Sequence, residues 1–138
     1  MRDHAVSVFV IAKRADGVWE TVLVHDPRKG TPCLWKLPGG KREGKEEPVK
    51  TAVRELEEET GISLSPESLA LIHEEDKITH VKYAYIAYID EFPPLKKIGD
   101  EGEDVSIFEV RELWEMADML YAHYLVVEPT LRSLLKIA

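Results

Sequence analysis

The stretch GKREGKEEPVKTAVRELEEETGI, residues 40–62, decides how this sequence folds. Pro48 stands where the first turn of a helix tolerates a missing N–H, and Gly61 stands where a helix often ends. Between them, apolar and small side chains recur at spacings of three and four, which places them on one face of a helix. The stretch therefore predicts a helix over residues 47–60 that packs on a sheet through Val49, Ala52, Val53, Leu56 and Thr60.

Glutamates crowd the second half of this predicted helix. Glu55, Glu58 and Glu59 are spaced by three and four residues, so we expect them to share a face away from the apolar stripe. Like charges at these spacings destabilise a helix by roughly 0.2–0.5 kcal/mol per pair. A solvated helix surface is the alternative, but such a surface more often interleaves lysines. A hard cation, Mg²⁺ or Mn²⁺, held by carboxylate oxygens accounts for the cluster better.

The sequence on either side of this helix alternates between strand and turn patterns. Strands are expected over residues 6–11, 19–24, 34–37, 69–73, 81–89 and 105–110. Pro38-Gly39-Gly40 is expected to break the third of them, and residues 90–104 predict a long loop. Residues 111–116 and 128–137 predict two further helices, the last with Pro129 at its start. This pattern is typical of a mixed α/β sandwich formed by one domain over residues 1–138.

The charge of the chain limits its partners. The sequence has 26 acidic and 18 basic residues, which gives a formal net charge of -8. A fold of this charge repels nucleic acid and anionic membrane surfaces, so we expect neither as a partner. An acidic protein that nevertheless handles phosphates requires a cation between the two.

Cysteine content and the N-terminal residues bear on the compartment. Cys33 is the only cysteine, which excludes an intrachain disulfide and indicates a reducing environment. A nucleophilic thiol is the alternative, but no reactive environment can be argued for Cys33 from the sequence. The apolar run over residues 5–12 is too short to span a bilayer and lacks the features of a signal peptide. We therefore expect a cytoplasmic protein.

The predicted helix and the loop before it match a known motif. Gly40, Glu46 and the run Arg54-Glu55-Leu56-Glu57-Glu58-Glu59-Thr60-Gly61-Ile62 resemble the complete box of the Nudix hydrolases. At roughly one chance in fifteen per fixed letter, seven matching letters arise by chance in about one window in 10⁸. The resemblance extends loosely over the other elements and implies the Nudix α/β/α sandwich with a mixed β-sheet.

The resemblance also implies an activity. Nudix hydrolases cleave a nucleoside diphosphate linked to another moiety, with Mg²⁺ as cofactor or Mn²⁺ in its place. Displacement at phosphorus needs charge neutralised on the phosphate oxygens, an aligned water and a base for its proton. By match to the motif, Glu58 and Glu59 are metal ligands, and Glu55 is either a further ligand or the general base. Arg54 orients a glutamate by a charged hydrogen bond, so Arg54, Glu55 and Glu58 form the implied catalytic set.

Further residues support this implied site. The Gly39 carbonyl joins the metal ligands, which explains a glycine where the backbone approaches an ion closely. Glu46 and Gly40 are supporting members of the box. A ligand from a later loop is expected from Glu101 or Glu103, although an ordinary acidic loop explains these residues equally well.

The substrate is less well indicated than the reaction. Trp35 could stack on a base, and His80 and Tyr83 lie in or beside a strand that could border the substrate, although packing roles are the alternative. The compact size and the sequence LPGGK resemble the MutT-like branch, which hydrolyses nucleoside triphosphates. The asparagine with which that branch reads a purine is missing, because Val126 and Val127 stand in its place. Dinucleoside polyphosphates and RNA ends therefore stay open.

Two classes of function follow from the sequence. The first is an active pyrophosphohydrolase that acts on a small-molecule nucleotide. The second is a Nudix-fold binding or sensing domain without turnover, which usually carries a degraded box. The unbroken set of glutamates favours the enzyme. The sequence leaves the oligomeric state open, with a homodimer as one alternative.

Overall fold

The computed structural model describes residues 2–26, 28 and 34–135, so Cys33 lies outside the described residues. The strands are β1 (His4–Lys13), β2 (Trp19–His25), β3 (Trp35–Lys36), β4 (Gly39–Lys41), β5 (Ala70–Asp76), β6 (Val81–Ile89) and β7 (Asp104–Glu109). The helices are α1 (Pro48–Thr60) and α2 (Tyr121–Leu135), with short 3₁₀ turns at Pro66–Ser68 and Val110–Trp114.

The strands form one mixed sheet with β1 at its centre. The strand order is β3-β2-β1-β6-β5, and β4 and β7 pair with β1 and β2, respectively. β1 is antiparallel to β2 and β4 but parallel to β6, with which it pairs from His4 opposite Val81 to Ala12 opposite Ile89. The predicted mixed sheet is confirmed.

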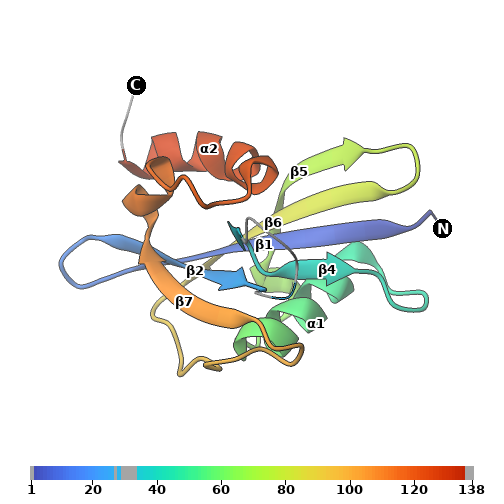
Figure 1. Ribbon diagram of the computed structural model, residues 1–138, viewed down its shortest axis with the longest axis horizontal. Coiled ribbons are helices and arrows are strands. Elements are labelled where there is room, and N and C mark those ends of the chain that lie inside the picture. Colours follow the sequence, from blue (N-terminus) through green and yellow to red (C-terminus); the bar gives the residue numbers. More distant parts are fainter. Residues whose placement is uncertain (1, 27, 29–33, 136–138) are drawn as a thin grey trace.

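The sheet separates two apolar cores. Because side chains alternate along a strand, β1 sends Phe9 and Ile11 to one face and Val8 and Val10 to the other. The first face packs on α2 through Val127 and Leu131, and the second packs on α1 through Ala52 and Leu56. Figure 1 shows α2 and α1 on opposite sides of the sheet. This arrangement is the predicted α/β/α sandwich.

Helix α1 lies within one residue of its predicted range. Pro48 occupies its first turn, and Gly61 ends it in the left-handed conformation with φ of 84°. The Gly61 N–H donates to the Glu57 carbonyl oxygen at 2.9 Å. Pro48 thus marks the start of the helix, because it lacks an N–H, and Gly61 marks its end, because it adopts the left-handed conformation.

Three predicted elements are wrong in detail. Gly39 and Gly40 continue into β4 because their backbone pairs with β1 and no side chain obstructs it. Residues 110–114 form a 3₁₀ turn in place of a helix. Helix α2 begins before Pro129, which lies inside it, because the Leu120 carbonyl accepts the N–H groups of His123 and Tyr124 and starts the helix earlier. No helix among the described residues is long and apolar enough to cross a membrane.

Candidate active site

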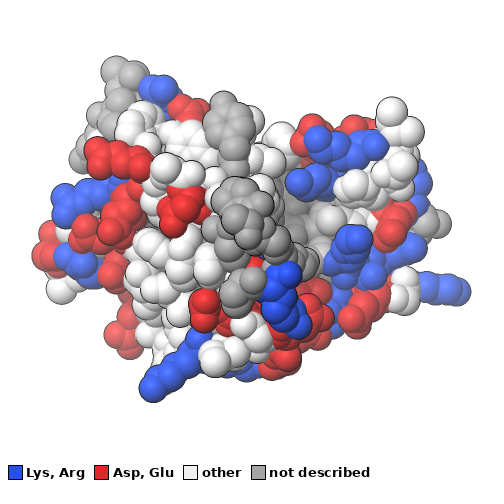
Figure 2. All heavy atoms as spheres, in the orientation of Figure 1, with Lys and Arg blue, Asp and Glu red and all other residues white. Residues whose placement is uncertain are grey.

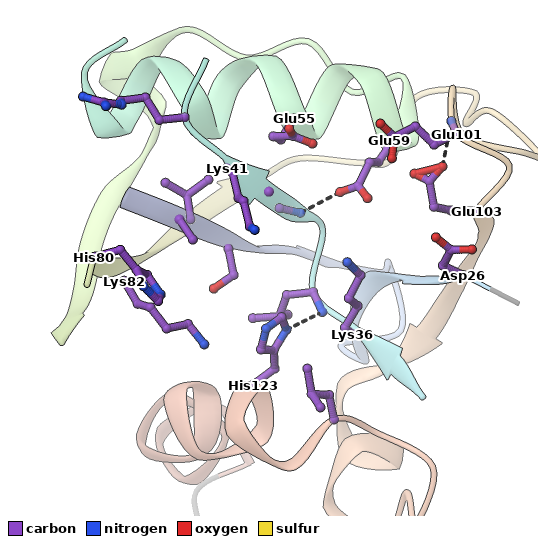
Figure 3. Close-up of a pocket in the computed structure, with 18 of the residues that line it drawn as sticks. Asp26, Lys36, Lys41, Glu55, Glu59, His80, Lys82, Glu101, Glu103 and His123 are labelled. Atoms are coloured by element: carbon purple, nitrogen blue, oxygen red, sulfur yellow. Dashed lines mark hydrogen bonds between the residues drawn. The ribbon is translucent and has the colours of Figure 1, made fainter. Parts of the chain in front are cut away.

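A cavity of about 630 Å³ opens beside the C-terminal half of α1. Its walls come from α1, the start of β1, the residue after β2, β3, β4, the start of β6, the start of α2 and the loop before β7. Figure 3 shows Glu55, Glu59, Glu101, Glu103 and Asp26 on one side of this cavity. Carboxylates from three separate segments of the chain thus share one wall.

Glu59 is a buried member of this wall, with 5% of its surface exposed. Its Oε1 accepts the Gly39 N–H at 2.6 Å. Burial raises the pKa of the Glu59 carboxyl to about 8, because the Gly39 N–H and the charge of Lys36 offset only part of the cost of removing the carboxylate from water. Glu59 was expected to lie away from the apolar stripe of α1, and the structure shows it buried beside the cavity. It lies at the junction between α1 and β4.

The paired glycines of β4 are required because β1 and the Glu55 side chain lie too close to leave room for a Cβ atom. A Cβ atom on Gly39 would lie 2.0 Å from the Val6 carbonyl oxygen, and one on Gly40 would lie 2.4 Å from the Glu55 carboxyl carbon. Any larger residue would push β4 away from β1 or displace the Glu55 side chain. The glycines thus allow the backbone of β4 to lie against the carboxylates of α1.

Arg54 joins the remaining glutamates of the motif into one network. Its guanidinium donates to both oxygens of Glu46, at 2.8 and 3.0 Å. It also donates to Glu55 at 3.0 Å and to Glu58 at 3.1 Å. The hydrogen bonds from Arg54 lower the pKa of Glu46 to about 2, so this carboxylate stays charged at all ordinary pH values. Arg54 therefore takes the orienting position that the motif implied.

Glu55 and Glu58 differ in their surroundings. Glu55 lines the cavity, and burial raises the pKa of its carboxyl despite the hydrogen bond from Arg54. The Glu58 side chain is 40% exposed, contacts Arg54 and does not line the cavity. The three predicted metal glutamates consequently differ in exposure and contacts. Glu59 is buried against β4, Glu55 faces the cavity, and Glu58 lies at the surface.

The acidic loop before β7 reaches the same cavity. Glu101 and Glu103 both line it, and Glu103 is only 3% exposed. The Glu103 Oε1 accepts the N–H of Glu101 at 2.8 Å, which fixes the turn between them. The structure therefore brings both candidate loop residues to the wall that carries Glu59.

The predicted substrate residues separate into two groups. His80 lines the cavity. Trp35 instead stacks on His25 at 4.7 Å between ring centroids and meets the edge of Phe108 at 4.9 Å. Tyr83 packs edge-on against His4 at 6.0 Å. Neither ring lines the cavity, because both are taken up by packing around the sheet.

Other residues line the cavity although the sequence did not identify them as site residues. Among them are Asp26, Lys36, Lys41, Lys82 and His123. Asp26 directly follows the apolar strand β2, a position at which a polar side chain often reaches a site, and this signal could have found it. His123 reaches the cavity only because of the way α2 packs on the sheet, and this packing cannot be predicted from a local sequence pattern.

The carboxylate oxygens of this wall are the kind of ligand that a hard divalent cation prefers. All the side-chain donors are carboxylate oxygens, and the buried Glu59 gains most from a neighbouring cation because its charge lacks full compensation. Among the described residues, no three acidic or histidine side chains surround a single point. Arg54 and the Gly39 N–H hold Glu55, Glu58 and Glu59 instead.

Comparison with known proteins identifies the family. The model of the NUDIX domain matches residues 1–129 of the chain. The chain belongs to the Nudix family. It is 33% identical over 101 residues to diphosphoinositol polyphosphate phosphohydrolase 2 of Mus musculus, an alignment that covers 73% of this chain and 52% of the relative. The chain thus spans about half the length of this curated relative.

Solved Nudix structures share the fold. The NUDIX domain of NrtR from Shewanella oneidensis, a complex with ADP ribose, superimposes with a TM-score of 0.75 at 19% identity, over 97% of this chain and 89% of that one. A structure from work on MutT of Aliivibrio salmonicida and Vibrio cholerae gives a TM-score of 0.69 at 23% identity, over 99% and 98%. At these identities the likeness shows the fold alone.

Proposed function

We propose that this Nudix protein is a metal-dependent pyrophosphohydrolase that cleaves a phosphoanhydride bond. One observation carries the proposal: Glu59 is buried against Gly39 on the cavity wall that also holds Glu55, Glu101 and Glu103. A buried carboxylate with a pKa raised to about 8 is costly to keep charged without a cation. Perturbed acids in a cleft are typical of functional sites.

In this proposal the chain's own residues divide the work. Glu59, the Gly39 carbonyl and Glu101 or Glu103 would hold Mg²⁺ or Mn²⁺, and Glu58, which does not line the cavity here, would turn its side chain to join them. Such a cation, when bound, neutralises charge on the phosphate oxygens and aligns a water. Glu55 accepts the proton of the attacking water, because burial raises the pKa of its carboxyl and it faces the cavity. Arg54 positions Glu55 and Glu58 through its hydrogen bonds.

The substrate class has three candidates. A nucleoside diphosphate linked to another group, such as a nucleoside triphosphate, follows from the motif. A dinucleoside polyphosphate is the second. A diphosphoinositol polyphosphate is the third, because curated relatives carry that name and are 33% identical over 101 residues. A domain that binds a nucleotide without turnover is the competing function.

Incubation of the protein with these substrates and Mg²⁺, with products separated, tests the proposal. Glu58→Gln should abolish turnover while the fold remains intact, because its side chain is partly exposed and packs on no apolar core. Glu57→Gln is the matched control, since Glu57 is exposed on the same helix and outside the Arg54 network. Failure to cleave any substrate would favour the binding domain, and near-normal turnover by Glu58→Gln would refute the role of Glu58.

A further inference from the structure

The cavity has a second wall of opposite character. Lys36 of β3, Lys82 of β6 and His123 of α2 line it together with the carboxylates. Figure 3 shows Lys82 and His123 across the cavity from Glu55 and Glu59, with Lys36 between the two sides. Lys36 acts on both sides, because its charge lowers the pKa of Glu59 and that of His123. Figure 2 shows Lys and Arg side chains beside the hollow on the right of this face.

The two lysines of this wall keep their charge available. Neither ammonium group makes an ion pair or hydrogen bond with another residue in the described ranges 2–26, 28 and 34–135. Other lysines do find acidic partners, such as Lys96 with Asp100 at 2.7 Å and Lys77 with Glu75 at 3.0 Å. In a chain of net charge -8, two lysines that face a cavity without such partners favour an anionic ligand.

His123 adds a neutral hydrogen-bond donor. Its Nδ1 accepts the N–H of Leu37 at 3.1 Å, so Nδ1 is unprotonated and the hydrogen of the ring lies on Nε2. Burial, followed by the charges of Lys82 and Lys36, lowers the pKa of His123 to about 4. The ring is therefore neutral near pH 7, and among the described residues no acceptor is in place for Nε2.

The described side chains of this wall offer charge and hydrogen bonds. Among the side chains that the structure describes, which do not include that of Tyr121, no phenylalanine, tyrosine or tryptophan lines the cavity. Trp35, the nearest candidate in the sequence, is held between His25 and Phe108. A nucleobase is commonly held by stacking on an aromatic ring. Phosphate oxygens suit ammonium groups and a ring N–H better.

We propose that Lys36, Lys82 and His123 bind a phosphate group that the substrate carries beyond the scissile pyrophosphate. The proposal rests on the proposed function for the presence of that pyrophosphate. Two sources share this chemistry. One is a phosphate monoester on a ring scaffold, and the other is an inner phosphate of a long polyphosphate chain.

Binding without turnover tests the site independently of catalysis. Two probes are titrated into the full chain by calorimetry: myo-inositol hexakisphosphate, which has no phosphoanhydride, and linear inorganic tetrapolyphosphate. Lys36→Met and Lys82→Met keep the length of the side chain and remove its charge. Each should weaken binding about tenfold, the size expected for one lost charged hydrogen bond. Lys50→Met is the matched control, since Lys50 is exposed on α1 outside the cavity.

The outcomes separate this inference from the proposed function. Weakening in both cavity variants with unchanged binding in Lys50→Met supports the site, and the probe that binds more tightly identifies the source. Equal weakening in all three variants, or no binding of either probe, overturns it. Turnover of the three candidate substrates with Mg²⁺ by the same preparations reports on the proposed function alone. An inactive chain that still loses probe binding in the cavity variants would fail the function and support the site.

Discussion

The two faces of the sheet are built differently. The core on the α2 side consists of apolar and aromatic side chains, such as Phe9, Leu113 and Leu131. The α1 side also contains apolar residues, but polar groups are buried within it, among them Thr51 and Glu59. Burying polar groups costs free energy unless each is hydrogen-bonded, so the α1 side gives up stability to hold its carboxylates. One face stabilises the fold and the other positions the site.

Replacing Glu59 should give the largest effect. Glu59→Gln can still accept the Gly39 N–H but cannot hold a cation, so kcat/KM should fall on the order of 10³-fold, since a metal supplies several kcal/mol of charge stabilisation. The melting temperature in a chelator at pH 7 should not fall, because a carboxyl with a pKa of about 8 is mostly protonated there and glutamine is its neutral counterpart. Steady-state rates and thermal unfolding are the measurements. A variant that retains activity would remove the functional distinction between the two faces.

Two matched leucines compare the faces directly. Leu131 on α2 and Leu56 on α1 are both fully buried. Truncation of either to alanine should lower the free energy of unfolding by about 3 kcal/mol. At a temperature where both variants stay folded, Leu56→Ala should lower kcat and Leu131→Ala should not. Urea denaturation and steady-state rates check this, and equal losses of kcat would contradict it.

His123 predicts how stability depends on pH. Its pKa is about 4 in the folded chain, against an ordinary 6.5. Between these values the unfolded chain binds the extra proton, so stability is lost as pH falls from 6.5 towards 4, by up to about 3 kcal/mol. Urea denaturation at several pH values should show this loss in the wild type and a smaller one in His123→Asn. Parallel curves for the two proteins would refute the assignment.

Thr51 should give the smallest effect. Its hydroxyl donates to the Glu46 Oε1 at 3.0 Å and lies 2.7 Å from the His4 Nε2. Thr51→Val removes this link at a cost of about 1–3 kcal/mol in stability, because buried partners lose a hydrogen bond. Arg54 should then hold Glu55 and Glu58 less firmly. A fall in kcat without a change in KM is the expected kinetic result, and a change in KM alone would argue against a positioning role.

The contrast between the faces also explains what the sequence could predict. Helix α1 was predicted within one residue because Pro48 and Gly61 mark its two ends. Its glutamates could be assigned to a site because few other residue types could make their contacts. The start of α2 was missed because any apolar side chain can fill its positions, so only Pro129 stood out. A strong local signal at Pro129 was overridden by the packing of Val127 and Leu131 on the sheet.

The candidate site was predictable only in part. Residues of the motif could be assigned, and Glu101 and Glu103 could be proposed because they follow one another in an acidic loop. The burial of Glu59 could not be foreseen from helical spacing, since it depends on β4 lying against α1. Lys36 and His123 come from segments far apart in the chain, and only the tertiary fold brings them to one cavity.

The parallel pairing of β1 with β6 has a consequence for how the chain folds. β1 is synthesised before β6, and each residue of β1 pairs with a residue of β6 that lies 77 positions further along, as in His4 opposite Val81. Closing a loop of that length costs entropy before any contact rewards it, so topologies of this kind fold slowly. During synthesis, β1 can therefore pair with β2 and β4 but not yet with β6. During that interval the apolar edge of β1 is exposed to aggregation.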